Sequence, residues 1–404
     1  MAKVQLAAGL SAGRSRMRAV VCAVEDSCLR FLGSGEAASR GWNRGRIADP
    51  EAISTSMAAA IGEAERRAGV HARGYVLGIG GEGVQGKNAR GLYEFGHKRE
   101  IVPEDLDYVI LRATQGRLDE GRVILQVLPQ DFILDGRAGY RNPRGLYCTR
   151  LEANVHLVTA PGVEHHALVS ALQQAGKDVE ESVFDPVAAA YAAILPEERN
   201  RGVALIDIGL QSTGVAIFDG ESLLVASSLA VSSDHLTRDL AWCLRVQHGL
   251  SLSYEDAENL KRECGCAIRG LTADNSLVEV PSPDGRPPQE IPCREINEIL
   301  QARAEELFHY VAGEIRRAGM DQALIEGVFL AGGGARLTGM CDMAEFILNC
   351  QARFALAVGI EDWPAELEDP AWTPAAGLAM YSARLKLDRD FERKAPGLLG
   401  LVLR

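Results

Sequence analysis

One pattern occurs twice in this chain of 404 residues, and it limits the fold more than any other feature. Near residues 4–24 and again near 203–227, an apolar run leads into a turn of small residues and then into a second apolar run that ends at an acidic turn. Such a repeat indicates an internal duplication, in which two similar halves flank a cleft. The length suffices for two or three domains, and the 42 glycines are typical of α/β domains with many tight turns.

The apolar residues predict how each half is built. Continuous or alternating apolar runs predict strands at 4–10, 17–24, 203–208, 214–218 and 328–331. Apolar residues at three- and four-residue spacing predict helices from Pro50, over 254–265 and over 294–318, and a hairpin at 271–292. Pro50 suits the first turn of a helix because the N–H group that proline lacks would have no partner there.

Between the two halves we expect a compact insert over about residues 78–162. We expect it to open with a strand at 75–79 and to continue with a helix from Pro103 and strands at 123–128 and 151–159. A β-α-β-β unit of this size is large enough to fold semi-independently.

Charge and cysteine content exclude several classes of protein. The formal net charge of −12 argues against a nucleic-acid-binding protein, which normally carries a basic surface. The nine cysteines include no CxxC pair and their number is odd, so we predict a reducing cytoplasm rather than a zinc site or a disulfide framework. No window of 18 uninterrupted apolar residues is present, so we expect any membrane contact to be peripheral.

Three consecutive glycines, Gly332, Gly333 and Gly334, directly follow the apolar run at 328–331 and precede a predicted helix. Glycines let a backbone approach a ligand closely, and the first turn of a helix offers unpaired N–H groups to an anion. This turn is a candidate nucleotide-binding loop, and its alternative interpretation is an ordinary tight turn.

A second candidate loop follows the strand at 203–208. Asp207 stands near the end of this strand, and Gly209, Ser212 and Thr213 come directly after it. A carboxylate in this place can orient a hydrated Mg²⁺ ion while backbone N–H groups hold phosphates. The alternative is an aspartate that caps its own turn.

The equivalent turn of the first half contains Gly13, Arg14 and Ser15. A simple hairpin turn is its alternative interpretation. Its position in the repeat makes it the third candidate phosphate-binding loop.

Two hairpin loops and a late glycine turn together resemble the actin, sugar-kinase and heat-shock chaperone superfamily. The resemblance implies an α/β, actin-like fold, with two duplicated domains of the ribonuclease H kind around a nucleotide cleft, and ATP or ADP as the ligand. It makes Asp185 and Pro186 the start of the family's connecting helix. It also implies that Glu258 and Lys261 reach the ribose and the adenine.

The insert narrows the resemblance to one family. Leu128-Pro129-Gln130-Asp131-Phe132, then Asn142-Pro143-Arg144-Gly145 and Arg150-Leu151-Glu152, resemble in order and spacing the signature subdomain of the bacterial cell-division family FtsA. The resemblance extends from about residue 9 to residue 385. It implies an adaptor that binds the C-terminal peptide of FtsZ, polymerises through its insert, and tethers the division ring to the cytoplasmic face of the cell membrane. Later division proteins are further implied partners, and nucleic acid is not.

The resemblance also implies a division of the chain into parts. We expect a first domain core at 1–80, continued by 163–200 and about 372–390, and an inserted α+β subdomain at 81–162. The second domain core is expected at 201–236 and 319–371, with an outer lobe at 237–318 that binds FtsZ. A membrane-targeting tail is expected at 391–404.

The first phosphate loop departs from the family pattern. Family members usually carry an aspartate and a threonine there, and this chain has Ser11 and Arg14. A guanidinium is a permanent cation with five donors, and two unit charges 4 Å apart are worth roughly 4 kcal/mol at an effective dielectric constant near 20. We therefore predict that Arg14 takes over part of the role of a Mg²⁺ ion at Asp207, and that ATP is hydrolysed slowly or not at all. The alternative is that Arg14 points to solvent and nucleotide binding is lost.

The last residues resemble the membrane-binding tail of the family. Arg393 and Lys394 can meet anionic lipid headgroups, and five apolar side chains can enter the acyl boundary: Leu398, Leu399, Leu401, Val402 and Leu403. Partial burial of these five would give about 3–5 kcal/mol, so a single chain would bind weakly and a polymer well. The alternative is a tail that docks on its own domain or frays.

Three other functions compete with this interpretation. A scaffold of a pilus or secretion platform shares the fold, a sugar or acid kinase would need a carboxylate where Ser11 stands, and a chaperone would need a peptide-binding domain after the core. We interpret Trp242, Trp363 and Trp372 as packing residues rather than as a ligand cage.

Overall fold

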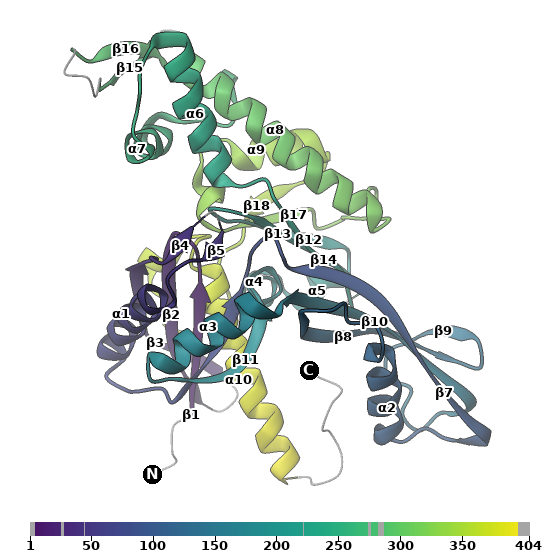
Figure 1. The fold of residues 1–404 in the computed structure, drawn as a ribbon. Helices are drawn as coiled ribbons and strands as arrows, with labels where there is room; N and C mark the ends of the chain where they lie inside the picture. Colours follow the sequence, from purple (N-terminus) through teal and green to yellow (C-terminus); the bar gives the residue numbers. More distant parts are fainter. Residues whose placement is uncertain are drawn as a thin grey trace.

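The structure is a computed structural model of the chain, and it describes residues 5–25, 28–43, 45–220, 222–273, 276–281 and 287–394. Figure 1 shows a first α/β domain on the left and a second near the centre, with an outer lobe above it. The insert extends to the lower right. The yellow helix α10 runs down from the region between the two domains.

The first domain is built on a five-stranded mixed sheet in the order β3-β2-β1-β6-β11. β1, β2 and β3 are antiparallel neighbours, whereas β6 pairs in parallel with β1 and β11 in parallel with β6. The predicted hairpin at 4–10 and 17–24 is confirmed by β1 and β2. The five strands are β1 (Gln5–Ala12), β2 (Arg16–Glu25), β3 (Cys28–Ala38), β6 (Gly74–Ile79) and β11 (Asp178–Phe184).

Helices cover both faces of this sheet because its strands carry apolar side chains on both sides. Helices α1 (Pro50–Ala68) and α3 (Gly162–Gln174) pack on the face that carries Leu10, and α10 (Thr373–Lys394) packs on the face that carries Ala7. Helix α1 begins where the sequence predicts it. The carboxylate of Asp49 accepts hydrogen bonds of 3.1 Å from the N–H groups two and three residues further on.

The second domain repeats the first sheet in order and direction. Its strands lie in the order β14-β13-β12-β17-β18, with β12, β13 and β14 antiparallel and β17 and β18 parallel to β12. The predicted duplication is therefore confirmed, and the strands predicted at 203–208 and 328–331 agree with the structure to the residue. The five strands are β12 (Val203–Ile208), β13 (Thr213–Asp219), β14 (Ser222–Leu229), β17 (Val328–Ala331) and β18 (Ala352–Phe354).

The outer lobe consists of helices and one hairpin on the second domain (Figure 1). Its long helix and its hairpin are confirmed at the predicted places. Buried residues of α6 and α8 pack on the apolar residues of β12 and β13 together with helix α9. The elements are α6 (Ser233–His248), α7 (Tyr254–Cys264), β15 (Leu277–Val280), β16 (Gln289–Pro292), α8 (Cys293–Arg317) and α9 (Met340–Leu348).

The insert has its own sheet and its own core. Helix α2 packs Leu106 and Val109 against apolar residues of the strands, including Phe132 and Leu151. The expectation that the strand at 75–79 opens the insert is wrong, because β6 lies between β1 and β11 in the first sheet. The elements of the insert are β7 (Gln85–Glu100), α2 (Pro103–Thr114), β8 (Arg122–Leu134), β9 (Arg137–Tyr140) and β10 (Tyr147–Pro161).

The insert is joined to the second domain along one edge, which we call the seam. Ser227 of β14 pairs with Gln85 of β7, so the two sheets form one nine-stranded sheet that ends in β7-β10-β8-β9. Nε2 of His156 accepts a 3.0 Å hydrogen bond from the N–H group of Ala226. Burial lowers the pKa of His156 to about 4, so the ring is neutral and free to accept this bond.

Helices α4 (Asp185–Ala193) and α10 pack closely where the two domains meet. Gly377 of α10 lies so near α4 that a Cβ atom on it would stand 1.9 Å from the carbonyl oxygen of Ala188. Only a glycine allows this approach.

The remaining short elements are β4 (Trp42–Asn43), β5 (Arg46–Ile47), α5 (Pro196–Arg199), η1 (Arg269–Leu271), η2 (Gly333–Arg336) and η3 (Ala365–Leu367).

Several predictions concern single residues and the tail. Trp363 and Trp372 pack in one apolar cluster as predicted, but Trp242 is 64% exposed on α6, so its interpretation as a packing residue is wrong. The helices that the structure describes include none that is long and apolar enough to span a bilayer. Leu398, Leu399, Leu401, Val402 and Leu403 lie outside the described residues, as do the side chains of Arg393 and Lys394.

Candidate functional site

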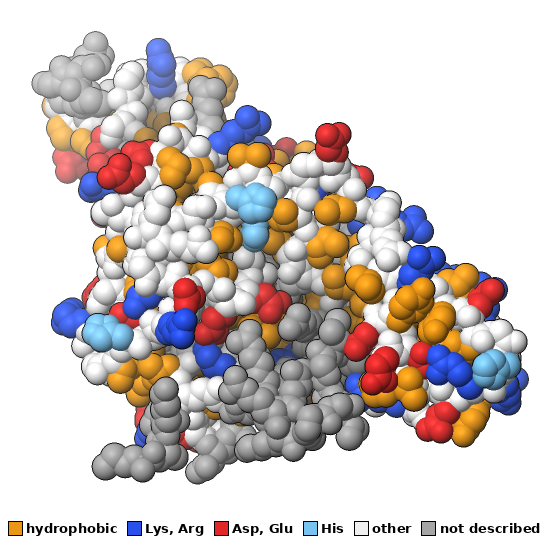
Figure 2. All heavy atoms as spheres, turned by 60° about the horizontal axis from the view of Figure 1, so that its bottom comes forward, with side chains coloured by type: hydrophobic (Ala, Val, Ile, Leu, Met, Phe, Trp, Pro, Cys, Tyr) orange, Lys and Arg blue, Asp and Glu red, His pale blue; other side chains and the backbone are white. Residues whose placement is uncertain are grey.

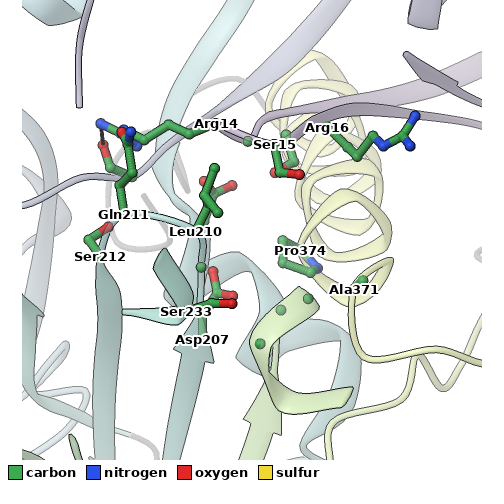
Figure 3. Close-up of a pocket in the computed structure, with 18 of the residues that line it drawn as sticks. Arg14, Ser15, Arg16, Asp207, Leu210, Gln211, Ser212, Ser233, Ala371 and Pro374 are labelled. Carbon is green, nitrogen blue, oxygen red and sulfur yellow. Dashed lines mark hydrogen bonds between the residues drawn. The ribbon is translucent and has the colours of Figure 1, made fainter. Parts of the chain in front are cut away.

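A cavity of about 420 Å³ lies between the two domains, and all three predicted loops line it. Figure 3 shows Arg14 and Ser15 on one side, with Asp207 and Ser212 on another. The structure therefore brings the three turns together around one space. The predicted binding residues that line the cavity are Gly13, Arg14, Ser15, Asp207, Gly209, Ser212, Glu258, Lys261, Gly332, Gly333 and Gly334.

Arg14 lies on the wall of the cavity and is fixed there. Its guanidinium carbon stands 4.7 Å from the centre of the Trp42 ring, and Nη2 donates a 3.2 Å hydrogen bond to the carbonyl oxygen of Gly80. Burial lowers the pKa of Arg14, although nearby carboxylates, Glu164 first among them, oppose this shift. In Figure 3 Arg14 and Arg16 extend in opposite directions from the hairpin turn. The alternative interpretation, in which Arg14 points to solvent, is therefore wrong.

Asp185, at the start of α4, adds a buried carboxyl group to the cavity. Burial, and to a smaller extent the charge of Asp207, raise the pKa of this carboxyl to about 8, against the hydrogen bond from Ser11 and the charge of Arg14. Its Oδ1 atom is buried without a hydrogen-bond partner in the part of the chain that the structure describes. A buried acceptor without a donor indicates a place for a ligand group or water.

The second loop places Asp207 beside the glycine turn. The N–H group of Gly209 donates a 3.0 Å hydrogen bond to the carbonyl oxygen of Ser212, which closes the turn. Gly332 has a φ of 83°, and a Cβ atom on it would stand 2.3 Å from Oδ1 of Asp207. Burial raises the pKa of Asp207 to about 6, opposed by the charge of Arg18.

Thr213 is the predicted residue that the structure places apart from the cavity lining. Its side chain is fully buried, and its hydroxyl donates a 2.7 Å hydrogen bond to the carbonyl oxygen of Val231. In this conformation the hydroxyl supports the turn below the cavity.

Glu258 and Lys261, on α7, form an ion pair at the wall of the cavity. Nζ of Lys261 stands 2.6 Å from Oε2 of Glu258 and also donates to the hydroxyls of Ser233 and Thr237, at 2.9 and 2.8 Å. Burial opposes the charged form of Glu258, but Lys261, Thr237 and Arg262 together outweigh burial and lower the pKa of Glu258. Helix α7 is therefore held firmly against α6.

The cavity is basic, a feature that the sequence analysis missed. Six basic and four acidic side chains line it. Besides Arg14 and Lys261, the basic residues are Arg16, Arg18, Arg262 and Arg336. Two of these had a signal in the sequence, because Arg336 lies close to the glycine run and Arg262 directly follows Lys261. Excess positive charge in a closed space favours a polyanionic ligand.

The donor set fits a metal ion only in part. Glu36 is paired with Arg18 at 2.7 Å and Glu258 with Lys261, which leaves Asp185 and Asp207 as carboxylate candidates. Within the described ranges no group of three or more His, Cys, Asp or Glu residues could hold a metal. Mg²⁺ commonly arrives with substrate phosphates and keeps several waters, needing one or two carboxylates. Asp207 suits such a nucleotide-borne ion rather than a resident one.

Solved structures share the fold. The chain matches one chain of a PilM-PilN type IV pilus biogenesis complex with a TM-score of 0.66 at 18% identity, over 93% of this chain and 98% of that one. It matches MreB5 of Spiroplasma citri bound to ADP with a TM-score of 0.52 at 14% identity, over 96% and 98%. At these identities the likeness shows an actin-like fold alone, and the predicted fold class is confirmed.

Family models and relatives are more specific. The model of the cell division protein FtsA matches residues 204–377, and that of the SHS2 domain inserted in FtsA matches residues 81–159. Cell division protein FtsA of Borreliella burgdorferi is 32% identical over 379 residues, which cover 93% of this chain and 90% of the relative. That of Pseudomonas aeruginosa is 29% identical, over 96% and 92%. The chain therefore belongs to the FtsA family of cell division proteins.

Proposed function

We propose that this protein is a division adaptor that binds the C-terminal peptide of FtsZ and tethers the Z ring to the cytoplasmic face of the cell membrane. The observation that carries the proposal is the similarity to FtsA proteins over nearly the whole chain, including the insert at 81–159. The likeness to a pilus protein concerns the fold alone, so the pilus scaffold remains the less supported alternative.

The outer lobe offers a surface for the FtsZ peptide, which we call the α6–α8 surface and define by Trp242 and Val246 of α6. These side chains are 64% and 63% exposed. Trp242 and Val246 lie one turn apart on α6, and Arg303 of α8 is bound to Asp239 of α6 at 2.6 Å, which holds the two helices together. Exposed aromatic anchors on rigid helices are typical of peptide-binding surfaces.

The insert supplies a second apolar surface, which supports self-association into filaments. Tyr108 and Leu111 of α2 are 44% and 57% exposed, and Tyr147 at the start of β10 is 58% exposed. Figure 2 shows hydrophobic side chains in orange among charged ones on the insert, at the right of the molecule. Self-association would also strengthen membrane binding, because linked tails act together. Later division proteins are further candidates for this surface.

A single co-sedimentation experiment tests the tether and the FtsZ surface. With liposomes that contain anionic lipid, the full chain should sediment and carry FtsZ with it. A chain that lacks residues 397–404 should stay in the supernatant and still bind the FtsZ peptide. Trp242→Ala should sediment with liposomes but bind the peptide about tenfold more weakly, as expected for an aromatic hot spot.

The control for the FtsZ surface is Phe346→Ala, which removes a 76% exposed aromatic side chain from α9 instead. It should bind the peptide as the wild type does. Sedimentation of the truncated chain at the wild-type level would refute the tail as the anchor, and unchanged peptide binding by Trp242→Ala would refute the α6–α8 surface.

We further propose that the cavity binds ATP or ADP and that hydrolysis is weak or absent. Polyphosphate suits the six lining basic side chains, and the glycines of the three lining loops let a backbone approach a ligand closely. Ser11 replaces the carboxylate expected in the first loop. Asp185, with a pKa of about 8, is largely protonated at neutral pH and cannot serve as an ionised base there.

The proposal of weak or absent hydrolysis is tested directly by measuring phosphate release from ATP with and without Mg²⁺. We expect release by the wild type to be slow and little changed by Asp207→Ala. Rapid Mg²⁺-dependent turnover that Asp207→Ala abolishes would overturn the proposal of weak hydrolysis. Binding of ATP itself is measured separately by calorimetry.

A further inference from the structure

We propose that a second pocket, at the seam, binds a polyvalent phosphate such as pyrophosphate and thereby holds the insert against the second domain. This pocket has a volume of about 350 Å³, and the inference does not depend on the proposed nucleotide binding. We call it the seam pocket and define it by basic side chains of the insert and of α8 and by two serines of β14: Lys87, Arg117, Arg122, Arg317, Ser227 and Ser228.

The charges that line the seam pocket do not cancel. Four basic side chains line it, three from the insert and one, Arg317, from α8, whereas the only carboxylates among its lining residues are those of Asp119 and Glu314. The two terminal nitrogens of Arg317 each stand 3.1 Å from one oxygen of Glu314, so this pair satisfies itself. The excess of positive charge therefore lies on the side of the insert.

The basic side chains of the insert are poorly paired. Nζ of Lys87 stands 4.0 Å from Oδ1 of Asp119, which is beyond hydrogen-bond distance. In the part of the chain that the structure describes, no hydrogen bond or ion pair joins Arg117 or Arg122 to a carboxylate. Like charges that line one pocket repel each other, and an anion with two or more negative charges turns this repulsion into attraction.

Arg122 is already oriented for an anion. Nε donates a 3.0 Å hydrogen bond to Oγ1 of Thr159, and Nη2 donates a 2.8 Å hydrogen bond to the carbonyl oxygen of Gly83. Among the described residues Nη1 has no hydrogen-bond acceptor, so its N–H groups are available to a ligand. A guanidinium fixed in one orientation binds phosphate oxygens well, because little side-chain freedom is lost on binding.

The second domain offers hydroxyl groups to the same pocket. The Oγ atoms of Ser227 and Ser228 are buried, and neither has a hydrogen-bond partner within the described residues. Buried hydroxyls are ordinarily hydrogen-bonded, and a hydroxyl can rotate to donate to an anion. An anion bound by Arg122 and by these serines would link the insert to β14, beside the pairing of Ser227 with Gln85. Ser228 also lines the cavity between the domains, so the two sites share a wall.

Hydrogen exchange followed by mass spectrometry locates the anion. The purified full chain is compared with and without sodium pyrophosphate. We expect slower exchange in peptides that contain residues 115–122 and 222–229, because the anion holds the insert and β14 together. Peptides that contain the loops at 9–16, 207–213 and 331–336 report separately on the cavity between the domains. The pyrophosphate concentration at which protection of 222–229 is half complete measures the affinity of the seam pocket.

Substitutions show whether the named side chains bind the anion. Arg117→Ala should raise this midpoint about tenfold, because a charged donor is lost. Ser227→Ala should raise it about fivefold through the loss of a hydroxyl donor. The matched control is Arg112→Ala, which removes an exposed arginine that is bonded to Gln115 on α2 and does not line the pocket. It should leave the midpoint unchanged.

Three results would each overturn the seam site. They are protection confined to the loops of the cavity between the domains, equal midpoints for Arg117→Ala and Arg112→Ala, and a wild-type midpoint for Ser227→Ala. None of them bears on nucleotide binding, which is measured with ATP. Failure of ATP to bind would likewise leave the seam site standing.

Discussion

Replacement of Gly377 by alanine should destabilise the folded chain by about 3 kcal/mol, the upper part of the range for overpacking a close contact. The added methyl group would stand 1.9 Å from the carbonyl oxygen of Ala188 and 2.3 Å from its carbonyl carbon. Both atoms belong to the backbone of α4, so no side-chain rotation relieves the overlap. Helices α4 and α10 would have to separate, which would open the packing beneath the cavity.

Urea unfolding of Gly377→Ala, followed by circular dichroism, measures this effect against a matched substitution. Gly62, inside α1, has no heavy atom within 4 Å of its absent Cβ atom. Gly62→Ala should therefore stabilise the protein by about 0.5–1 kcal/mol, because alanine is the better helix former. Equal and small effects of the two substitutions would show that α4 and α10 do not pack as closely as described.

Replacement of Asp185 by asparagine should stabilise the ligand-free protein, and the gain should grow with pH. Burial is the main cause that raises the pKa of Asp185 from its ordinary value of 3.8 to about 8. Between these two values the folded chain keeps a proton that the unfolded chain has released, so stability falls as the pH rises. Each pH unit in this window costs the wild type up to about 1.4 kcal/mol. Asparagine does not titrate, so the variant escapes this loss.

Urea unfolding at pH 5, 6.5 and 8 measures the difference between Asp185→Asn and the wild type. We expect a small gain at pH 5 and a gain of several kcal/mol at pH 8. Asp219→Asn, at the exposed end of β13, is the control and should show no such trend. A difference that stays constant with pH would contradict a buried, protonated Asp185.

Local patterns sufficed to predict the core of both domains. The apolar runs that form β1, β2, β12 and β17 are interrupted by glycines at the turns, so their ends are visible in the chain itself. The strands β3 and β14 were not predicted, although each completes its sheet. Such strands are stabilised mainly by pairing with a neighbouring strand of the sheet. Because this stabilisation comes from tertiary contacts, their own sequences carry only a weak strand pattern.

The other differences between the predicted and the observed fold arise from contacts between residues that are far apart in the sequence. β6 looks from the sequence like the first strand of the insert, because the insert follows it directly, yet its partners β1 and β11 lie far away along the chain. The sequence likewise does not show which tryptophans are exposed and which are buried. Trp242 lies in an amphipathic helix, and only the packing of α6 against α8 decides that its ring faces outward.

The sequence predicted the loops of the candidate site, but it did not predict most of the basic side chains that line the cavity. Asp207 and the glycines at 332–334 stand out because each comes at the end of an apolar run. Arg18 is one of three arginines on the first hairpin, and alternation along β2 alone does not show that Arg16 and Arg18 line the cavity. Trp42, which stacks on Arg14, comes from a short strand that has no sequence signal of its own.

The seam between β7 and β14 gives the molecule a second point of attachment between its halves. The insert leaves the first domain after β6 and returns to it at α3, yet its flank is hydrogen-bonded to the second sheet at Ser227 and Ala226. A body held at two separate places cannot swing about either one alone. Any change in the angle between the halves must therefore flex the insert or part the seam, so the direction in which the insert points is tied mechanically to the width of the cavity.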